Sequence, residues 1–268
     1  MSARSISVPL TSHEVSLPAV ILIGVALNAL VVTVMTSFAE GGGGLTFGIS
    51  PFQLVALFVA ARLSLESDDT EAPHAPWLEA IVIAMALVPS SAVSWLALAI
   101  FAGYHAWHSH GARRTGSLIF LAAALASIWS SVILKWLALP VTTAESYLLG
   151  QMLSLVRPDI VQVANVIGNP STHSLILMTK CTTSDALPHA AVAVAAVAYL
   201  FGEVNTTKLR QSVLLLCGIY FIANMLRLAA MAWSSESYAL VHGPIGANVF
   251  DLFQAMVVLT LGNWASEA

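Results

Sequence analysis

Charged residues are scarce in this sequence, which has only 10 Lys and Arg and 14 Asp and Glu among its 268 residues, or 9% of the chain. A soluble domain of this length needs a surface with about 25% charged residues. The chain is instead 58% hydrophobic, and its charges fall in short stretches between apolar runs. This composition excludes a soluble globular domain and indicates a protein that lies largely within a lipid bilayer.

Cysteine is also scarce, and the two present, Cys181 and Cys217, belong to no Cys-x-x-Cys pair and to no Cys/His cluster. The sequence therefore gives no support for structural zinc, attached haem or a disulfide scaffold, and we expect no metal and no cofactor. The net charge of −4 forms no basic stripe, so we expect no nucleic-acid partner. Neither a His-Glu-x-x-His motif nor a Gly-x-Ser-Gly motif within a span is present, which argues against a zinc or serine intramembrane protease.

Seven apolar runs divide the chain, and six of them have the length of a single span. The runs cover residues 17–39, 47–64, 77–107, 116–138, 184–202, 211–233 and 245–263. The run 77–107 contains the sequence VPSS at 88–91, so it is either one kinked helix or a hairpin of two helices. Only Arg4 precedes the first run as a basic residue, so we expect a retained span rather than a cleaved signal peptide. We predict an all-α polytopic membrane protein, a bundle of about eight (7–8) transmembrane helices forming a single transmembrane domain over residues 1–268.

The distribution of lysine and arginine predicts the orientation of this bundle. The connections 108–115 and 203–210 each carry two basic residues, whereas 40–46 and 234–244 carry none. We therefore expect the two basic connections to face the cytoplasm, and 139–183 and 234–244 to face the opposite side. The protein is then a multi-pass protein of the cell (plasma or inner) membrane, with membrane lipids around it.

The segment 139–183 is the only long connection between apolar runs, and it ends near a cysteine. We expect an interfacial amphipathic helix over 145–156, followed by a turn and a strand that begin near Gly168. Cys181 lies where this segment meets the next span, close to the outer membrane surface. A lone cysteine is most often an inert small hydrophobe, but a thiolate that is stabilised by a nearby cation is a nucleophile at neutral pH.

Arg227 is the candidate for that cation, because it lies inside the run 211–233. An arginine within a span costs roughly 2.5–3.5 kcal/mol on insertion scales, so it is a functional candidate by default. It precedes Trp233 by six residues, about 9 Å of helix, which places it at a depth similar to that of Cys181. Asn224 lies one turn earlier on the same face. The alternative is that Arg227 only extends to the outer headgroups.

A histidine at the same membrane face supplies a candidate acid and base. His242 opens the last run, and a group that titrates near pH 6.5 suits transfer of a proton from a thiol to a leaving amine. An interfacial histidine without a role remains the alternative. His189, eight residues after Cys181, is a second candidate base, and His173 and Asp185 are weaker candidates for orienting groups.

Three separate spans thus bring a nucleophile, a cation and an acid–base group to one face, which favours an enzyme. The order Cys, Asn-x-x-Arg and His-x-x-x-Gly resembles the exosortase/archaeosortase family of membrane transpeptidases. The resemblance covers about 150–263, and the matching residues are Cys181, Asn224, Arg227, His242 and Gly246, together with Gly168. The chain differs from the family at one point, because the family cysteine is usually followed by Ser or Thr and then Gly, whereas Thr182 and Thr183 follow here.

The resemblance implies a cysteine transpeptidase or protease that cleaves C-terminal sorting signals, of the PEP-CTERM or PGF-CTERM kind, on secreted proteins. Such a signal has three parts: a short motif, a hydrophobic helix and a few basic residues. By the resemblance, Cys181 is the nucleophile, Arg227 stabilises the thiolate or oxyanion, His242 is the general acid and base, and Asn224 and Gly246 support them. The new C-terminus passes to a lipid or surface-polymer acceptor.

Two other functions remain open from the sequence. A transporter or channel is one, with Arg227 and Asp251 lining a polar pathway, although most spans are Ala, Val and Leu throughout. We expect Asp251 to have a structural role with a polar partner. A non-catalytic assembly factor of the same family is the other, and Thr183 in place of the usual glycine is the feature that favours it.

Overall fold

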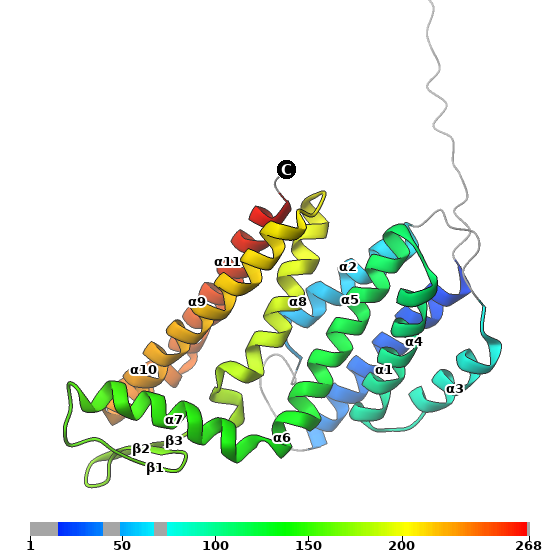
Figure 1. Cartoon of the computed structure of the whole chain (residues 1–268). Coiled ribbons are helices and arrows are strands. Elements are labelled where there is room, and N and C mark those ends of the chain that lie inside the picture. Colours follow the sequence, from blue (N-terminus) through cyan, green and yellow to red (C-terminus); the bar gives the residue numbers. More distant parts are fainter. Residues whose placement is uncertain (1–15, 40–48, 67–73, 267–268) are drawn as a thin grey trace, which may run out of the picture.

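The computed structural model describes residues 16–39, 49–66 and 74–266, and most of these are helical (Figure 1). The helices are α1 (Leu17–Ala39), α2 (Pro51–Leu65), α3 (Pro76–Ala86), α4 (Ser91–His108), α5 (Gly111–Ile128), α6 (Leu134–Trp136), α7 (Ala138–Ser154), α8 (Thr183–Phe201), α9 (Thr206–Trp233), α10 (Ser235–His242) and α11 (Pro244–Ser266). A π-helical turn, η1 (Trp129–Ile133), joins α5 to α6, and a 3-10 turn, η2 (Thr179–Cys181), precedes α8. The strands are β1 (Val161–Val163), β2 (Val166–Asn169) and β3 (His173–Ile176).

The mostly helical class is confirmed, but the count of about eight spans is not. Within the described residues, five helices are long and apolar enough to cross a membrane: α1, the continuous helix Gly111–Trp136, α8, α9 and α11. The helices α2 and α3 are apolar but have only 15 and 11 residues. The helix α2 is shorter than the run 47–64 because it begins at Pro51, where the fixed φ of proline suits the first turn. The helix α3 is short because it ends at Ala86, ahead of Pro89.

Two local expectations in these regions were met in different degrees. The run 77–107 forms two helices, because α3 ends at Ala86 and α4 begins at Ser91, with Pro89 between them. The bundle is not strictly all-α, since three antiparallel strands in the order β1-β2-β3 lie between α7 and α8. A turn and a strand were expected there, but the pairing of three strands was not. Isolated short apolar stretches do not reveal their pairing partners.

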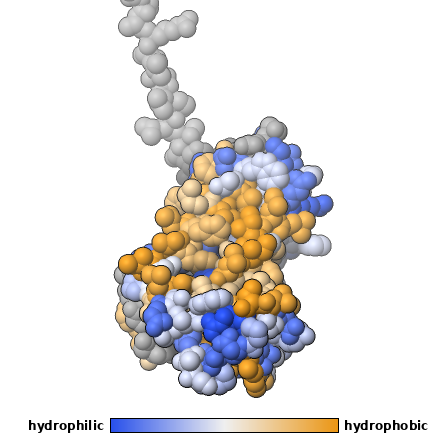
Figure 2. Space-filling model, turned by 90° about the vertical axis from the view of Figure 1, so that its left-hand side faces the viewer, coloured by the Kyte–Doolittle hydropathy of each residue, from blue (hydrophilic) through white to orange (hydrophobic). Residues whose placement is uncertain are grey.

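The elements divide between the two ends of the bundle. Figure 1 shows α7, the sheet and α10 at one end, and the α4–α5 and α8–α9 connections at the opposite end. The basic residues of the connections 108–115 and 203–210 therefore lie at the end away from α7, mostly in the first turns of α5 and α9. Figure 2 shows hydrophobic residues over the middle of one face and hydrophilic residues gathered at its lower end. This pattern is compatible with a membrane protein.

The N-terminal helices are joined by small side chains and by hydrogen bonds between helices. Alanines fill much of the buried contact among α1, α2, α4 and α5, which allows the helix backbones to approach closely. Asn28 Nδ2 donates to the carbonyl oxygen of Ala86 at 2.7 Å and to Ser94 Oγ at 3.3 Å. Trp95 Nε1 donates to Thr33 Oγ1 at 3.1 Å. These polar side chains are therefore used to hold α1 against the α3–α4 hairpin.

The sheet packs against α7 and the last turns of α9. Ile167 and Leu175 from the sheet are buried with Leu149 of α7 and with Leu228 and Met231 of α9. In this register Ile167 lies opposite Leu175. The shared apolar cluster fixes the connection between α7 and α8 against the same end of α9 that carries the candidate arginine.

Glycine is required in the middle of this sheet. Gly168 has a φ of +146°, a conformation that side-chain-bearing residues rarely adopt. A Cβ at this position would collide with the backbone of His173 on β3. The close pairing of β2 with β3, which determines the path of the chain towards Cys181, therefore depends on Gly168.

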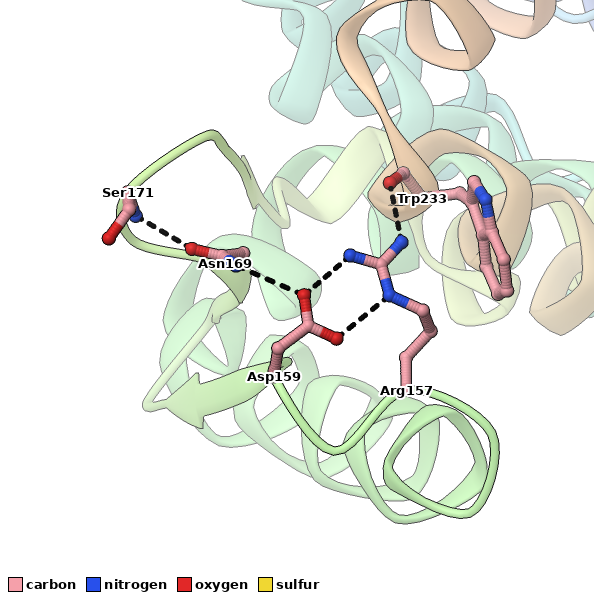
Figure 3. A network of polar contacts seen from close by, with 5 residues as sticks. All are labelled: Arg157, Asp159, Asn169, Ser171 and Trp233. Carbon is pink, nitrogen blue, oxygen red and sulfur yellow. Dashed lines mark hydrogen bonds and ion pairs between the residues drawn. The ribbon is translucent and has the colours of Figure 1, made fainter.

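A polar clamp joins the connection after α7 to the end of α9 (Figure 3). Arg157 Nε donates to Asp159 Oδ1 at 2.8 Å, and Arg157 Nη1 donates to the carbonyl oxygen of Trp233 at 3.3 Å. The guanidinium also lies 5.0 Å from the centre of the Trp233 ring. Asn169 Nδ2 donates to Asp159 Oδ2 at 3.0 Å, and the neighbouring Arg157 holds the pKa of Asp159 well below its usual range.

The last helix is anchored unevenly. All its buried residues lie in its second half, from Gln254 onward. Ser212 Oγ of α9 donates to the carbonyl oxygen of Leu261 at 2.9 Å, and a Cβ on Gly262 would collide with the Val197 side chain of α8. The first half of α11, which leads from α10, has no fully buried residue.

Candidate functional site

Cys181 is the last residue of the 3-10 turn η2 and lies two residues before α8. Its backbone N–H donates to the carbonyl oxygen of Met178 at 2.9 Å, which closes the turn. The side chain is partly buried beside the apolar cluster of α7, the sheet and α9. Both Cys181 and Cys217 are free thiols. The turn thus presents an unpaired thiol at the end of the bundle that holds α7 and α10.

Asn224 joins α9 directly to this turn, 43 residues away in the sequence. Its Nδ2 donates to the carbonyl oxygen of Cys181 at 3.0 Å and to Thr183 Oγ1 at 3.2 Å. The Asn224 side chain is buried, with 6% of its surface exposed. A buried amide that makes both of these bonds holds the segment from Cys181 to Thr183 against α9.

Arg227 follows one turn later on α9 and borders the same cavity as Cys181. Its guanidinium carbon lies 4.6 Å from the centre of the Phe250 ring of α11. Arg227 Nε is buried and has no hydrogen-bond partner within the part of the chain that the structure describes. A guanidinium that is stacked on an aromatic ring and not neutralised by a carboxylate can bind a developing negative charge.

A cavity of about 170 Å³ lies between the η2 turn and helices α8, α9 and α11. It is lined by Lys180, Cys181, Thr182, Thr183, Ala186, Tyr220, Asn224, Arg227, Phe250, Asp251 and Gln254. Three of the five site residues expected from the sequence, Cys181, Asn224 and Arg227, therefore meet at one cavity. Asp251, for which a structural role with a polar partner was expected, is an exposed carboxylate that borders the same cavity as Lys180 and Arg227.

His242 does not line this cavity. It is the last residue of α10, is exposed, and stacks on Tyr238 with 4.9 Å between ring centres. Gly246 lies in the first turn of α11, where a Cβ would collide with the backbone carbonyl oxygens of Leu240 and Val241. The glycine therefore permits the sharp corner between α10 and α11 that positions His242.

The weaker candidates lie elsewhere. His189 is buried in α8, and its Nε2 lies 3.3 Å from Ser130 Oγ in the π-helical turn, so it does not border the cavity. Asp185 lies in the first turn of α8, and its carbonyl oxygen accepts from the same Ser130 hydroxyl at 3.4 Å. His173 lies on β3, with Nε2 3.0 Å from the carbonyl oxygen of Met231. None of the three lines the cavity with Cys181.

Sequence reasoning missed Glu145, a buried acid of α7 with 7% of its surface exposed. Its two carboxylate oxygens lie 3.0 and 3.2 Å from the backbone nitrogen of Thr183, which donates to them at the start of α8. Burial raises the pKa of Glu145, and the backbone N–H groups of Thr183 and Ser184 oppose that rise. The sequence feature that could have identified Glu145 is an acidic residue within the amphipathic helix predicted over 145–156.

The described residues contain no group of three or more His, Cys, Asp and Glu side chains arranged to hold a metal ion. The charged side chains around the cavity are Lys180, Arg227 and Asp251.

Comparisons with known proteins identify no relative of this chain. No protein-family model, no curated protein and no solved structure matches the chain.

Proposed function

We propose that this chain is a membrane-embedded cysteine transpeptidase or protease that resembles the exosortases and archaeosortases. The observation that carries the proposal is the meeting of Cys181, Asn224 and Arg227 at one cavity. A thiol comes from η2, and an amide bonded to its turn and a guanidinium whose Nε has no partner among the described residues come from α9, which is distant in sequence. A thiol nucleophile and a cation that stabilises the developing oxyanion are two of the groups that acyl transfer through a thioester uses.

In the proposed reaction, Cys181 Sγ attacks the scissile carbonyl carbon and the C–N bond breaks. A thioester forms, and the proton of the thiol passes through a base to the leaving amine. Arg227 stabilises the negative charge that develops on the carbonyl oxygen. His242 has the role of acid and base, although in this structure it lies at the α10–α11 corner outside the cavity. An acceptor nucleophile or water then cleaves the thioester and restores the thiol.

The proposed substrates are secreted proteins that end in a short motif, one hydrophobic helix and a few basic residues. The acceptor is a lipid or a surface polymer. A substrate that arrives as a membrane helix suits a site bordered by spans, because its diffusion is confined to two dimensions. The basic residues of the connections 108–115 and 203–210 lie at the end of the bundle away from the cavity, which supports a site on the extracytoplasmic side of the cell membrane.

Two alternatives have specific observations in their favour. The cavity carries Lys180, Arg227 and Asp251 within or beside spans, which is also the character of a transport pathway. Thr183 in place of the family's usual glycine favours a non-catalytic assembly factor. Both alternatives predict that the thiol is dispensable.

The test is processing of a reporter with a three-part C-terminal signal in cells that express the chain. We expect Cys181→Ala to abolish cleavage, because no other group of the cavity replaces the thiol in a thioester. Cys217→Ala, which removes the deeper thiol of α9, is the matched control and should cleave normally. Normal cleavage by Cys181→Ala at equal membrane abundance would refute the proposal and favour a transporter or an assembly factor.

A further inference from the structure

Helix α8 contains a proline near its start, which leaves one carbonyl oxygen without a donor from its own helix. In a regular α-helix the carbonyl oxygen of Ser184 accepts from the N–H of residue 188, but Pro188 has no N–H. Within a span such a carbonyl needs a donor from another part of the protein, because lipid supplies none. The first turn of α8, residues 183–187, is therefore joined to the rest of the helix by fewer hydrogen bonds than a regular turn.

The π-helical turn η1 supplies the missing donor. Trp129 Nε1 donates to the carbonyl oxygen of Ser184 at 2.8 Å. The next residue, Ser130, donates through Oγ to the carbonyl oxygen of Asp185 at 3.4 Å and lies 3.3 Å from His189 Nε2. Two consecutive side chains of η1 thus bind the first two turns of α8. A π-turn has i→i+5 bonds and turns less per residue than an α-helix, which helps neighbouring side chains to face the same partner.

The turn that η1 holds is also part of the cavity wall. Thr183 and Ala186 line the cavity together with Cys181. Asn224 of α9 donates to Thr183 Oγ1, and Glu145 of α7 accepts from the Thr183 N–H. The first turn of α8 is therefore held by side chains of α9, α7 and η1, and η1 connects it to the N-terminal half of the chain.

We propose that Trp129 is a positioning residue for the candidate site, because its indole N–H replaces the hydrogen bond that Pro188 removes and so fixes the first turn of α8 beside Cys181. This inference deepens the proposed function and rests on it. The indole N–H is needed only while residue 188 lacks an N–H of its own. A proline-free α8 should therefore tolerate loss of the indole N–H, whereas a role of Trp129 in packing alone predicts no such rescue.

The experiment is a double-mutant cycle on cleavage of the three-part reporter, expressed per folded molecule in the membrane. Trp129→Phe keeps an aromatic ring but removes the N–H, so we expect cleavage to fall roughly fivefold or more. Pro188→Ala restores an N–H that Ser184 can accept. In that background, Trp129→Phe should change cleavage by less than about twofold.

A second tryptophan provides the matched control. Trp95 Nε1 of α4 donates to Thr33 Oγ1 of α1 at 3.1 Å, at a distance from the cavity lining. Trp95→Phe removes the same kind of bond, so it should lower thermal stability without lowering cleavage per folded molecule. Pro188→Ala should not alter its effect.

A second arm follows the cavity wall itself and does not depend on catalysis. Ala186→Cys, in a chain that also carries Cys181→Ala and Cys217→Ala, places one thiol on the first turn of α8. Its alkylation by N-ethylmaleimide in membranes reports how readily that turn moves. We expect Trp129→Phe to accelerate alkylation roughly three- to tenfold, and Pro188→Ala to abolish this acceleration.

The outcomes distinguish this inference from the proposed function. An unchanged alkylation rate in Trp129→Phe overturns the inference, even if cleavage depends on Cys181. An acceleration that persists in the Pro188→Ala background also overturns it, because the two residues then act independently. If Pro188→Ala removes the acceleration but Cys181→Ala still cleaves the reporter, the proposed function fails and the positioning of the cavity wall by Trp129 stands.

Discussion

Asparagines that bond one helix to another serve different purposes in the two halves of the molecule. Between α1 and the α3–α4 hairpin, Asn28 is bonded to a carbonyl oxygen and a hydroxyl of the neighbouring helices, and its role ends with that contact. Between η2 and α9, Asn224 makes the same two kinds of bond, but one of them is to the backbone of Cys181. Arg227, one turn later, borders a cavity with its Nε unpaired among the described residues.

This comparison shows that hydrogen bonding of an amide between helices is not itself a sign of function. Both asparagines hold a helix to its neighbour, and each contributes a similar amount to stability. The difference lies in the cavity beside Asn224 and in the charge next to it. Substitutions in the two halves therefore separate a stabilising role from a catalytic one.

The largest effect is expected at Arg227. Arg227→Gln removes the positive charge at the cavity but keeps a polar side chain of similar length. Loss of one group that stabilises an oxyanion lowers the rate about 100- to 1000-fold, so we expect reporter cleavage to fall by that factor. Arg114→Gln, an exposed arginine at the opposite end, is the control and should cleave at the parent rate. Equal cleavage by both variants would contradict the assignment of Arg227.

A paired substitution of the two asparagines sharpens the comparison directly. Asn28→Ala and Asn224→Ala each leave two acceptors without a donor, so each should lower the free energy of unfolding by about 1–3 kcal/mol. Thermal denaturation in detergent measures this loss. Cleavage per folded molecule should fall at least tenfold only in Asn224→Ala. Similar cleavage in the two variants would mean that Asn224, like Asn28, contributes to stability alone.

A smaller effect is expected at the corner between α10 and α11. Gly246→Ala adds a methyl group against the carbonyl oxygens of Leu240 and Val241, and overpacking of this kind costs about 1–3 kcal/mol. Because the corner positions His242, cleavage should fall several-fold. Gly218→Ala is the control, because a Cβ there meets nothing within 4 Å. If Gly246→Ala has the stability and the cleavage rate of the parent, then neither depends on the tight corner between α10 and α11.

Much of the fold follows from apolar runs and proline. The break in the run 77–107 was expected as one of two possibilities because Pro89 has no N–H for a helix interior. The sheet was only partly expected, since strand pairing depends on contacts such as that of Ile167 with Leu175. The count of about eight spans is not confirmed, because an apolar run does not show where its helix begins or ends.

The sequence predicted that the site residues lie at one end of the bundle, but not which way each side chain points. Helix rise places Arg227 and Cys181 at one end of the bundle, and the structure brings both to one cavity. Rise along a helix does not reveal which way a side chain at a corner points, so it did not show that His242 stacks on Tyr238 outside the cavity. Glu145 was missed because its partner on α8 lies 38 residues away.

Because α11 is anchored mainly near its end, separating the end of this helix from its neighbours costs more free energy than separating its start. Near Leu261 and Gly262, opening breaks a hydrogen bond to Ser212 and exposes packed side chains. Near Phe250, opening breaks mainly the contact with Arg227. Backbone amides of α11 should therefore exchange with solvent sooner near its start than near its end. The start of the last helix, which carries Phe250 and Asp251 of the cavity wall, is therefore the part of α11 that we expect to separate most readily from its neighbours.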